Sequence, residues 1–196
     1  MRIRPLAVAL PVLALVALPS TAFAHPGHAD GGFPDGLAHP LTGADHVLAM
    51  LAVGLWAGQR GGRARWTLPL AFLASMLVGF ALGTAGVAVP GVEAGLLASV
   101  LVLGLCVAAA VRGPTLFAAA LVGVCALLHG HAHGSEAPAG ANIATYGAGF
   151  ALATASLHAA GIGLAAMLAR AAGGRALRFA GAATVAAGLV LVVISG

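Results

Sequence analysis

The chain has 196 residues, of which 61% are hydrophobic and only 7% are charged, and its mean hydropathy is +1.04. A composition this apolar excludes a soluble globular domain with a solvated surface, so the chain must lie in lipid. The formal net charge is +4, and it comes from arginine because the chain contains no lysine. The arginines stand singly between apolar runs, which indicates membrane orientation rather than nucleic-acid binding.

The first 24 residues have the three regions of a cleavable signal peptide. Two arginines precede an apolar run from Leu6 to Leu18, and the small-residue pattern Ala22-Phe23-Ala24 follows. This run is too short for an ordinary spanning helix, although an uncleaved anchor is the alternative. We predict a signal peptide over residues 1–24 and a single transmembrane domain over residues 25–196.

The rest of the sequence contains six apolar stretches joined by short connections rich in Gly and Pro. Such short connections favour antiparallel neighbours. We therefore predict an all-α fold, a polytopic membrane bundle of six transmembrane helices. The expected spans are 41–58, 66–89, 92–111, 114–131, 143–169 and 176–195.

The charged residues favour one orientation of this bundle. If the mature N-terminus is periplasmic, the first, third and fifth connections lie in the cytoplasm. Every arginine after the signal peptide falls in or beside one of these connections, as the positive-inside rule requires, and the five acidic residues lie towards the outer side. The sequence thus predicts a multi-pass protein of the bacterial inner membrane, in contact with membrane lipid.

The histidines gather on the predicted outer side. Four lead into the first span, three close the fourth, and only His158 lies deep in a span. The first and fourth spans also look unusually short, and short spans in corresponding halves of a transporter point to its binding site. Imidazole and carboxylate groups together attract cations and supply nitrogen and oxygen ligands. The histidines concerned are His25, His28, His39 and His46, then His129, His131 and His133.

Spacing predicts which side chains of the first span share a face. Pro40 suits the first turn of a helix, which puts His39 just before the helix and Asp45-His46 about two turns in. Met50, four residues after His46, is either a soft ligand or a core side chain. An aspartate inside an apolar span needs a partner, through direct ligation or a hydrogen bond to a ligating imidazole.

In the fourth span, His129 and His133 share a face if the helix continues to Glu136, whereas His131 points elsewhere. Gly130 and Gly134 are candidates for loosening that turn. Deeper in the bundle, His158 is either a relay position for an ion or a hydrogen-bonding group between helices.

This pattern favours uptake of a divalent transition metal, with no bound cofactor. Hydrated metal would exchange water for imidazole, and its affinity should fall as histidines protonate below about pH 6.5. Nitrogen and oxygen ligands accept nickel, cobalt and zinc alike. The alternatives are an intramembrane zinc-dependent hydrolase that uses the same His/Asp cluster and a metallochaperone docking platform that does not transport. A homo-oligomer is left open, because small residues such as Gly79 and Gly83 favour close helix packing within or between protomers.

Three segments resemble the HupE/UreJ family of nickel and cobalt permeases, and the similarity extends over essentially the whole chain. The most specific is His39-Pro40-Leu41-Thr42-Gly43-Ala44-Asp45-His46-Val47-Leu48-Ala49-Met50, followed by Val53-Gly54. The other two are His129-Gly130-His131-Ala132-His133-Gly134-Ser135-Glu136 and Ala153-Thr154-Ala155-Ser156-Leu157-His158.

The resemblance implies a transporter rather than an enzyme. Its cargo would be Ni²⁺ or Co²⁺, and it would indirectly serve the proteins that mature hydrogenase or urease. The residues that the resemblance assigns to the metal path are His39, Asp45, His46, His129, His133, Glu136 and His158. The pattern of histidines adds His25, His28 and His131 as secondary candidates.

Overall fold

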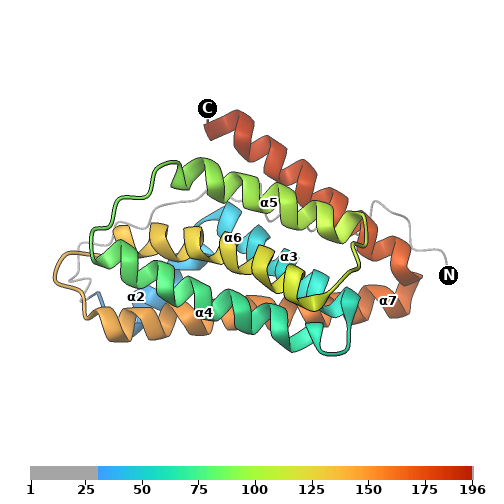
Figure 1. The fold of residues 1–196 in the computed structure, drawn as a ribbon, viewed down its shortest axis with the longest axis horizontal. Helices are drawn as coiled ribbons and strands as arrows, with labels where there is room; N and C mark the ends of the chain where they lie inside the picture. The colour runs from blue at the N-terminus through green and yellow to red at the C-terminus, as the bar shows by residue number, and fades with distance from the viewer. Residues whose placement is uncertain (1–30, 196) are drawn as a thin grey trace.

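The computed structural model describes residues 31–195, and these residues form helices joined by short connections, without a β-strand (Figure 1). The predicted signal peptide, His25 and His28 lie outside the described residues. The helices are α2 (Phe33–Ala38), the 3-10 helix η1 (His39–Leu41), α3 (Ala44–Arg60), α4 (Ala64–Thr84), α5 (Val92–Ala108), α6 (Thr115–Ser135) and α7 (Ile143–Ser195).

Helix α7 consists of two helical segments joined at a sharp break. Gly173 has φ 68° and ψ −163°, a conformation that glycine adopts without the steric penalty of a Cβ. The second segment therefore runs back beside α5 rather than onward (Figure 1). Counting these two segments with α3, α4, α5 and α6 gives the six predicted helices. The connection predicted over residues 170–175 is almost entirely helical, because Gly173 alone turns the chain.

The chain bends just before α3. The segment from Phe33 to Leu41 and the helix α3 meet at 84°. Thr42 Oγ1 donates a hydrogen bond to His39 O at 2.7 Å, and Gly43 is extended, so the helix restarts at Ala44. The prediction of a helix running on from Pro40 was therefore wrong, because η1 and α3 are separate. Asp45 and His46 lie in the first turn of α3, not two turns in.

Helices α4, α6 and α7 are each long and apolar enough to cross a membrane, and a fourth span results if the bent segment and α3 are counted together. Helices α3 and α5 have 17 residues each, which is about 26 Å at 1.5 Å per residue. Helix α6 extends to Ser135, so the fourth span is not short. The short spans are the first and third, contrary to the prediction for the fourth.

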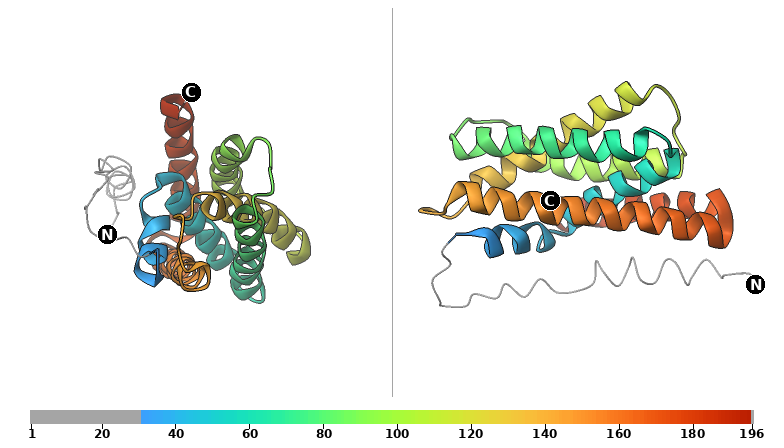
Figure 2. Two further views of the ribbon diagram at one scale, coloured as in Figure 1. Left: turned by 90° about the vertical axis from the view of Figure 1, so that its left-hand side faces the viewer. Right: turned by 90° about the horizontal axis from the view of Figure 1, so that it is seen from below.

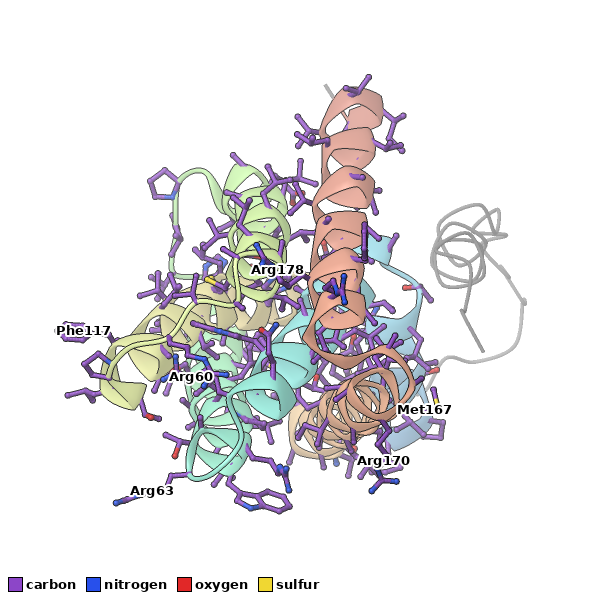
Figure 3. The ribbon with its side chains drawn as sticks, turned by 90° about the vertical axis from the view of Figure 1, so that its right-hand side faces the viewer. Arg60, Arg63, Phe117, Met167, Arg170 and Arg178 are labelled. Atoms are coloured by element: carbon purple, nitrogen blue, oxygen red, sulfur yellow. The ribbon has the colours of Figure 1, made fainter. Side chains whose placement is uncertain are left out.

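Successive helices alternate in direction, so their connections lie at two opposite ends of the bundle (Figure 1). The histidine end contains η1, the start of α3 and the end of α6. The arginine end contains Arg60, Arg63, Arg112, Arg175 and Arg178, and Figure 3 views the molecule from this end. Figure 2 shows α2 beside the first half of α7 at the histidine end.

The distribution of side chains is that of a protein in lipid. Leu116, Phe117 and Val193 are more than 70% exposed, whereas five histidines are buried. Apolar side chains can face outward where the surroundings are hydrocarbon, while imidazoles must find partners inside. The described residues therefore form a multi-pass membrane bundle.

Glycines bring the α4 and α6 backbones into contact. A Cβ at Gly79 would collide with Leu127 O, and a Cβ at Gly130 would collide with Met76 O. Gly83 and Gly134 make equivalent approaches one turn further on. These small residues thus pack two helices of one chain closely. Gly130 and Gly134 serve this contact, and α6 stays helical through them.

Gly130→Ala is expected to destabilise the protein by about 1–3 kcal/mol, because the new methyl group would overlap the Met76 carbonyl. Thermal unfolding in detergent measures the effect. Gly163→Ala is the matched control, since Gly163 lies in α7 with open space beside it and alanine is the better helix former. Equal melting temperatures for the two variants would contradict the α4–α6 contact.

Candidate metal centre

The histidine end brings together side chains from η1, α3 and α6. The His46 ring centroid lies 4.1 Å from that of His133 and 4.7 Å from that of His129, and the His39 ring lies 4.6 Å from His133. We call His39, His46, His129 and His133 the histidine cluster. Histidines from two segments far apart in sequence, 39–46 and 129–133, therefore lie close together at one end of the bundle.

Glu136 follows α6 directly and faces the outer part of the histidine cluster. Its Oε2 lies 3.3 Å from His39 Nε2. One ligand atom from each of His39, His133 and Glu136 can be chosen so that all three lie within 4.8 Å of one another, which suits a shared metal ion. The hydrogen bond from His39 holds the pKa of the Glu136 carboxyl below its usual value, against the opposing effect of partial burial. The carboxylate is therefore ionised at neutral pH.

The inner part of the cluster contains buried nitrogen atoms without hydrogen-bond partners among the described residues. These are His46 Nε2, His129 Nδ1 and both ring nitrogens of His133. His129 is 0% exposed and His133 is 2% exposed, so bulk water does not reach them. Buried polar atoms are nearly always satisfied, so unpaired atoms gathered at one place indicate a site for a ligand. Several imidazoles packed together with unpaired nitrogens offer the type of ligand that transition-metal ions prefer.

Asp45 fixes the tautomer of His46. Its Oδ1 lies 3.0 Å from His46 Nδ1. An ionised carboxylate can only accept hydrogen bonds, so Nδ1 carries the proton and Nε2 keeps its lone pair. Nε2 is the buried atom of His46 that has no partner. Asp45 thus hydrogen-bonds the His46 ring and leaves Nε2 open to a ligand.

Ser99 fixes the tautomer of His129 in the same way, a role that was not predicted from the sequence. Its Oγ lies 2.7 Å from Leu96 O and 2.7 Å from His129 Nε2. The single hydroxyl proton goes to the Leu96 carbonyl, which can only accept, so Oγ accepts the Nε2 proton of His129. The lone pair then remains on Nδ1, the atom without a partner. Its sequence signal was the lone hydroxyl side chain within apolar α5.

His158 lies deeper than the cluster, beyond the aromatic ring of Phe72. The Phe72 ring centroid is 6.0 Å from His129 and 4.9 Å from His158. His158 is 1% exposed, and neither ring nitrogen has a hydrogen-bond partner among residues 31–195. It does not hydrogen-bond between helices, which was its alternative role. No sequence signal distinguished Phe72 from an ordinary core phenylalanine.

Helices α3 and α7 are in backbone contact beside His158. A Cβ at Gly54 would collide with His158 O and meet Gly161, and a Cβ at Gly161 would meet Leu51 O. The two helices therefore cross without a gap at this depth. Met50 of α3 is fully buried in the apolar core of the bundle.

His131 faces away from the histidine cluster, as its helical position predicts. Its Nε2 lies 2.6 Å from Val87 O, in the connection between α4 and α5. The ring can donate to that carbonyl, so its role in the structure is to hold this connection. It shares helix, residue type and burial with His129 and His133 but not their surroundings.

Ser99→Ala is expected to weaken Ni²⁺ binding by about tenfold to a hundredfold, because the Nδ1 lone pair of His129 would no longer be fixed in place. Competition with a metal indicator on the purified protein measures the affinity. Ser156→Ala is the matched control: its hydroxyl also bonds a carbonyl of its own helix, but on an exposed face. Equal affinities in the two variants would show that Ser99 does not position His129.

Comparison with known proteins identifies the family of the chain. Residues 13–191 match the family described as HupE / UreJ protein. The chain is 50% identical over 182 residues to "Protein HupE" of Rhizobium leguminosarum bv. viciae, covering 92% of this chain and 95% of that protein. No solved structure matches it. With one family model covering most of its length and a relative this similar, the chain belongs to the HupE/UreJ family.

Proposed function

We propose that the protein is a permease of the bacterial inner membrane that takes up a divalent transition metal, Ni²⁺ or Co²⁺, through the histidine cluster. The observation that carries this proposal is the close packing of buried imidazole rings from α3 and α6 that have nitrogens without hydrogen-bond partners. Such atoms are costly in an apolar interior unless a ligand satisfies them. One metal ion satisfies several neutral imidazoles at once.

The exposure of the ligands supports a stepwise path from outside to inside. The side chains of Glu136 and His39 are 55% and 29% exposed, whereas His133, His46 and His129 are buried. A hydrated ion first meets the Glu136 carboxylate and His39. It then exchanges water for imidazole at the buried part of the cluster, and it continues past Phe72 to His158.

The charges support an orientation for this path. Arginine collects at the end opposite the histidine cluster, and the positive-inside rule assigns that end to the cytoplasm. The histidine end then faces the periplasm, as does the mature N-terminus. Metal would therefore move inward, which makes the protein a transporter that takes up metal.

Family membership supports the choice of cargo. Imidazole with a carboxylate accepts nickel, cobalt and zinc, so the ligands alone do not select a metal. The resemblance to the HupE/UreJ family implies nickel or cobalt, supplied for the maturation of hydrogenase or urease. Neither the family nor the described residues support the zinc hydrolase reading, so we infer a transporter and not an enzyme.

His46→Ala and Asp45→Asn should each reduce ⁶³Ni²⁺ uptake into proteoliposomes by at least about tenfold. The first variant removes a ligand, and the second removes the carboxylate that fixes the tautomer of His46. His131→Gln is the matched control, a buried histidine of α6 that faces Val87 instead of the cluster. It should retain most of the uptake. Protein levels and melting temperatures are measured in parallel.

The control also makes this proposal refutable. Uptake that persists in His46→Ala at normal protein levels would remove the histidine cluster from the transport path. Loss of uptake in His131→Gln as well as in His46→Ala and Asp45→Asn, with folding intact, would mean that the effect does not depend on contact with the histidine cluster. Uptake of neither Ni²⁺ nor Co²⁺ by the unaltered protein would overturn the permease assignment itself.

Glu136→Gln should weaken Ni²⁺ binding at neutral pH, because it removes a carboxylate whose pKa is held below the usual value and which is therefore ionised. Titration of detergent-solubilised protein with Ni²⁺ measures the affinity. An unchanged affinity would remove Glu136 from the metal site.

A further inference from the structure

A second site lies at the arginine end, far from the histidine cluster. A cavity of about 580 Å³ opens there between the end of α3, the connection that follows α5 and the break in α7. Three arginines line it from two separate parts of the chain: Arg112 follows α5, and Arg175 and Arg178 follow the break. Figure 3 shows Arg178 on the second segment of α7, at the end where Arg60 and Arg170 also lie.

The guanidinium groups that line this cavity are largely free to bind a ligand. Within residues 31–195, Arg112 and Arg175 make no hydrogen bond or ion pair, and Arg178 uses only its Nε, which donates to Ala108 O at 2.8 Å. Arg60 differs: it donates to Val111 O and Gly113 O and lies over the Trp56 ring. Arg60 therefore holds the fold together, whereas the cavity arginines keep most of their donors.

The positive charge of the cavity is not balanced by nearby acid. Among the described residues, both ion pairs that involve a carboxylate are at the histidine end, with Glu136 and Asp45. Glu93 begins α5 at that same end. In addition, the helix that restarts after Gly173 directs its N-terminus, with partial positive charge, towards the same cavity. An anion is the ligand that this arrangement favours.

The surroundings of the cavity point to a lipid as the source of the anion. Exposed apolar side chains precede and follow the cavity residues along α7: Met167 is 62% exposed and Phe179 is 60% exposed. A phosphodiester would meet the arginines while its acyl chains lay along these apolar side chains. Arginine binds phosphate oxygens through its fork of N–H donors, and basic pockets between transmembrane helices bind anionic head groups.

We propose that this cavity binds the phosphate-bearing head group of an anionic phospholipid, with Arg112, Arg175 and Arg178 as its ligands. The site depends on membrane insertion and not on metal transport. A bound lipid would join the connection that follows α5 to the start of the second segment of α7. The same phosphate chemistry would admit a soluble phosphate, so the experiment must separate the two sources.

The test measures lipid binding to the purified full-length protein in neutral detergent. Phosphatidylglycerol, phosphatidylcholine and inorganic phosphate are titrated separately, with native mass spectrometry and thermal shift as readouts. Arg112→Gln and Arg175→Gln should each weaken phosphatidylglycerol binding about fivefold, and the double variant about 25-fold. Arg65→Gln is the matched control, because Arg65 is exposed at the same end of the bundle. It lines neither this cavity nor the smaller one beside Arg60 and Arg63.

Each outcome decides for or against the site. Selective loss in the cavity variants, with Arg65→Gln within about twofold of the unaltered protein, supports it. Equal loss in all variants would indicate general attraction to positive charge, and equal binding of phosphatidylcholine would exclude head-group selection; either overturns the proposal. Stabilisation by inorganic phosphate alone would overturn the lipid source. Because no readout involves metal, failure here leaves the permease proposal standing, and failure of Ni²⁺ uptake leaves the lipid site standing.

Discussion

The structure depends on one constraint: a polar atom buried in a membrane protein cannot turn to water for a partner. Most polar groups of this bundle meet the constraint through helical hydrogen bonds or through carbonyls at helix ends. The histidine cluster does not, because its closely packed rings have nitrogens without partners among the described residues. A bound ligand would supply the missing partners. The hydrogen bonds of Asp45 and Ser99 determine which nitrogen of His46 and His129 keeps its lone pair.

Much of the architecture could be predicted from the sequence because hydrocarbon leaves a chain few options. Six apolar stretches gave six helical segments, and the position of the arginines separated the two ends. The face shared by His129 and His133, with His131 outside it, followed from helical spacing alone. The family was also identified correctly, since its longest motif, from His39 to Met50, is specific.

What the sequence could not supply were features that depend on a single backbone angle or on a neighbour in space. Gly173 turns the chain within one residue, so the expected fifth connection is helical. Gly43 separates η1 from α3, which moves Asp45 and His46 to the start of the helix. Ser99 and Phe72 have roles only because α4, α5 and α6 meet, and composition says nothing of which helices become neighbours.

The crossing of α3 and α7 at Gly54 and Gly161 leaves no space between these two helices beside His158. Their backbones touch there, so an ion could pass between α3 and α7 at this depth only if the helices moved apart. Under the proposed function, a path through this crossing would open by collective helix movements, which take microseconds to milliseconds.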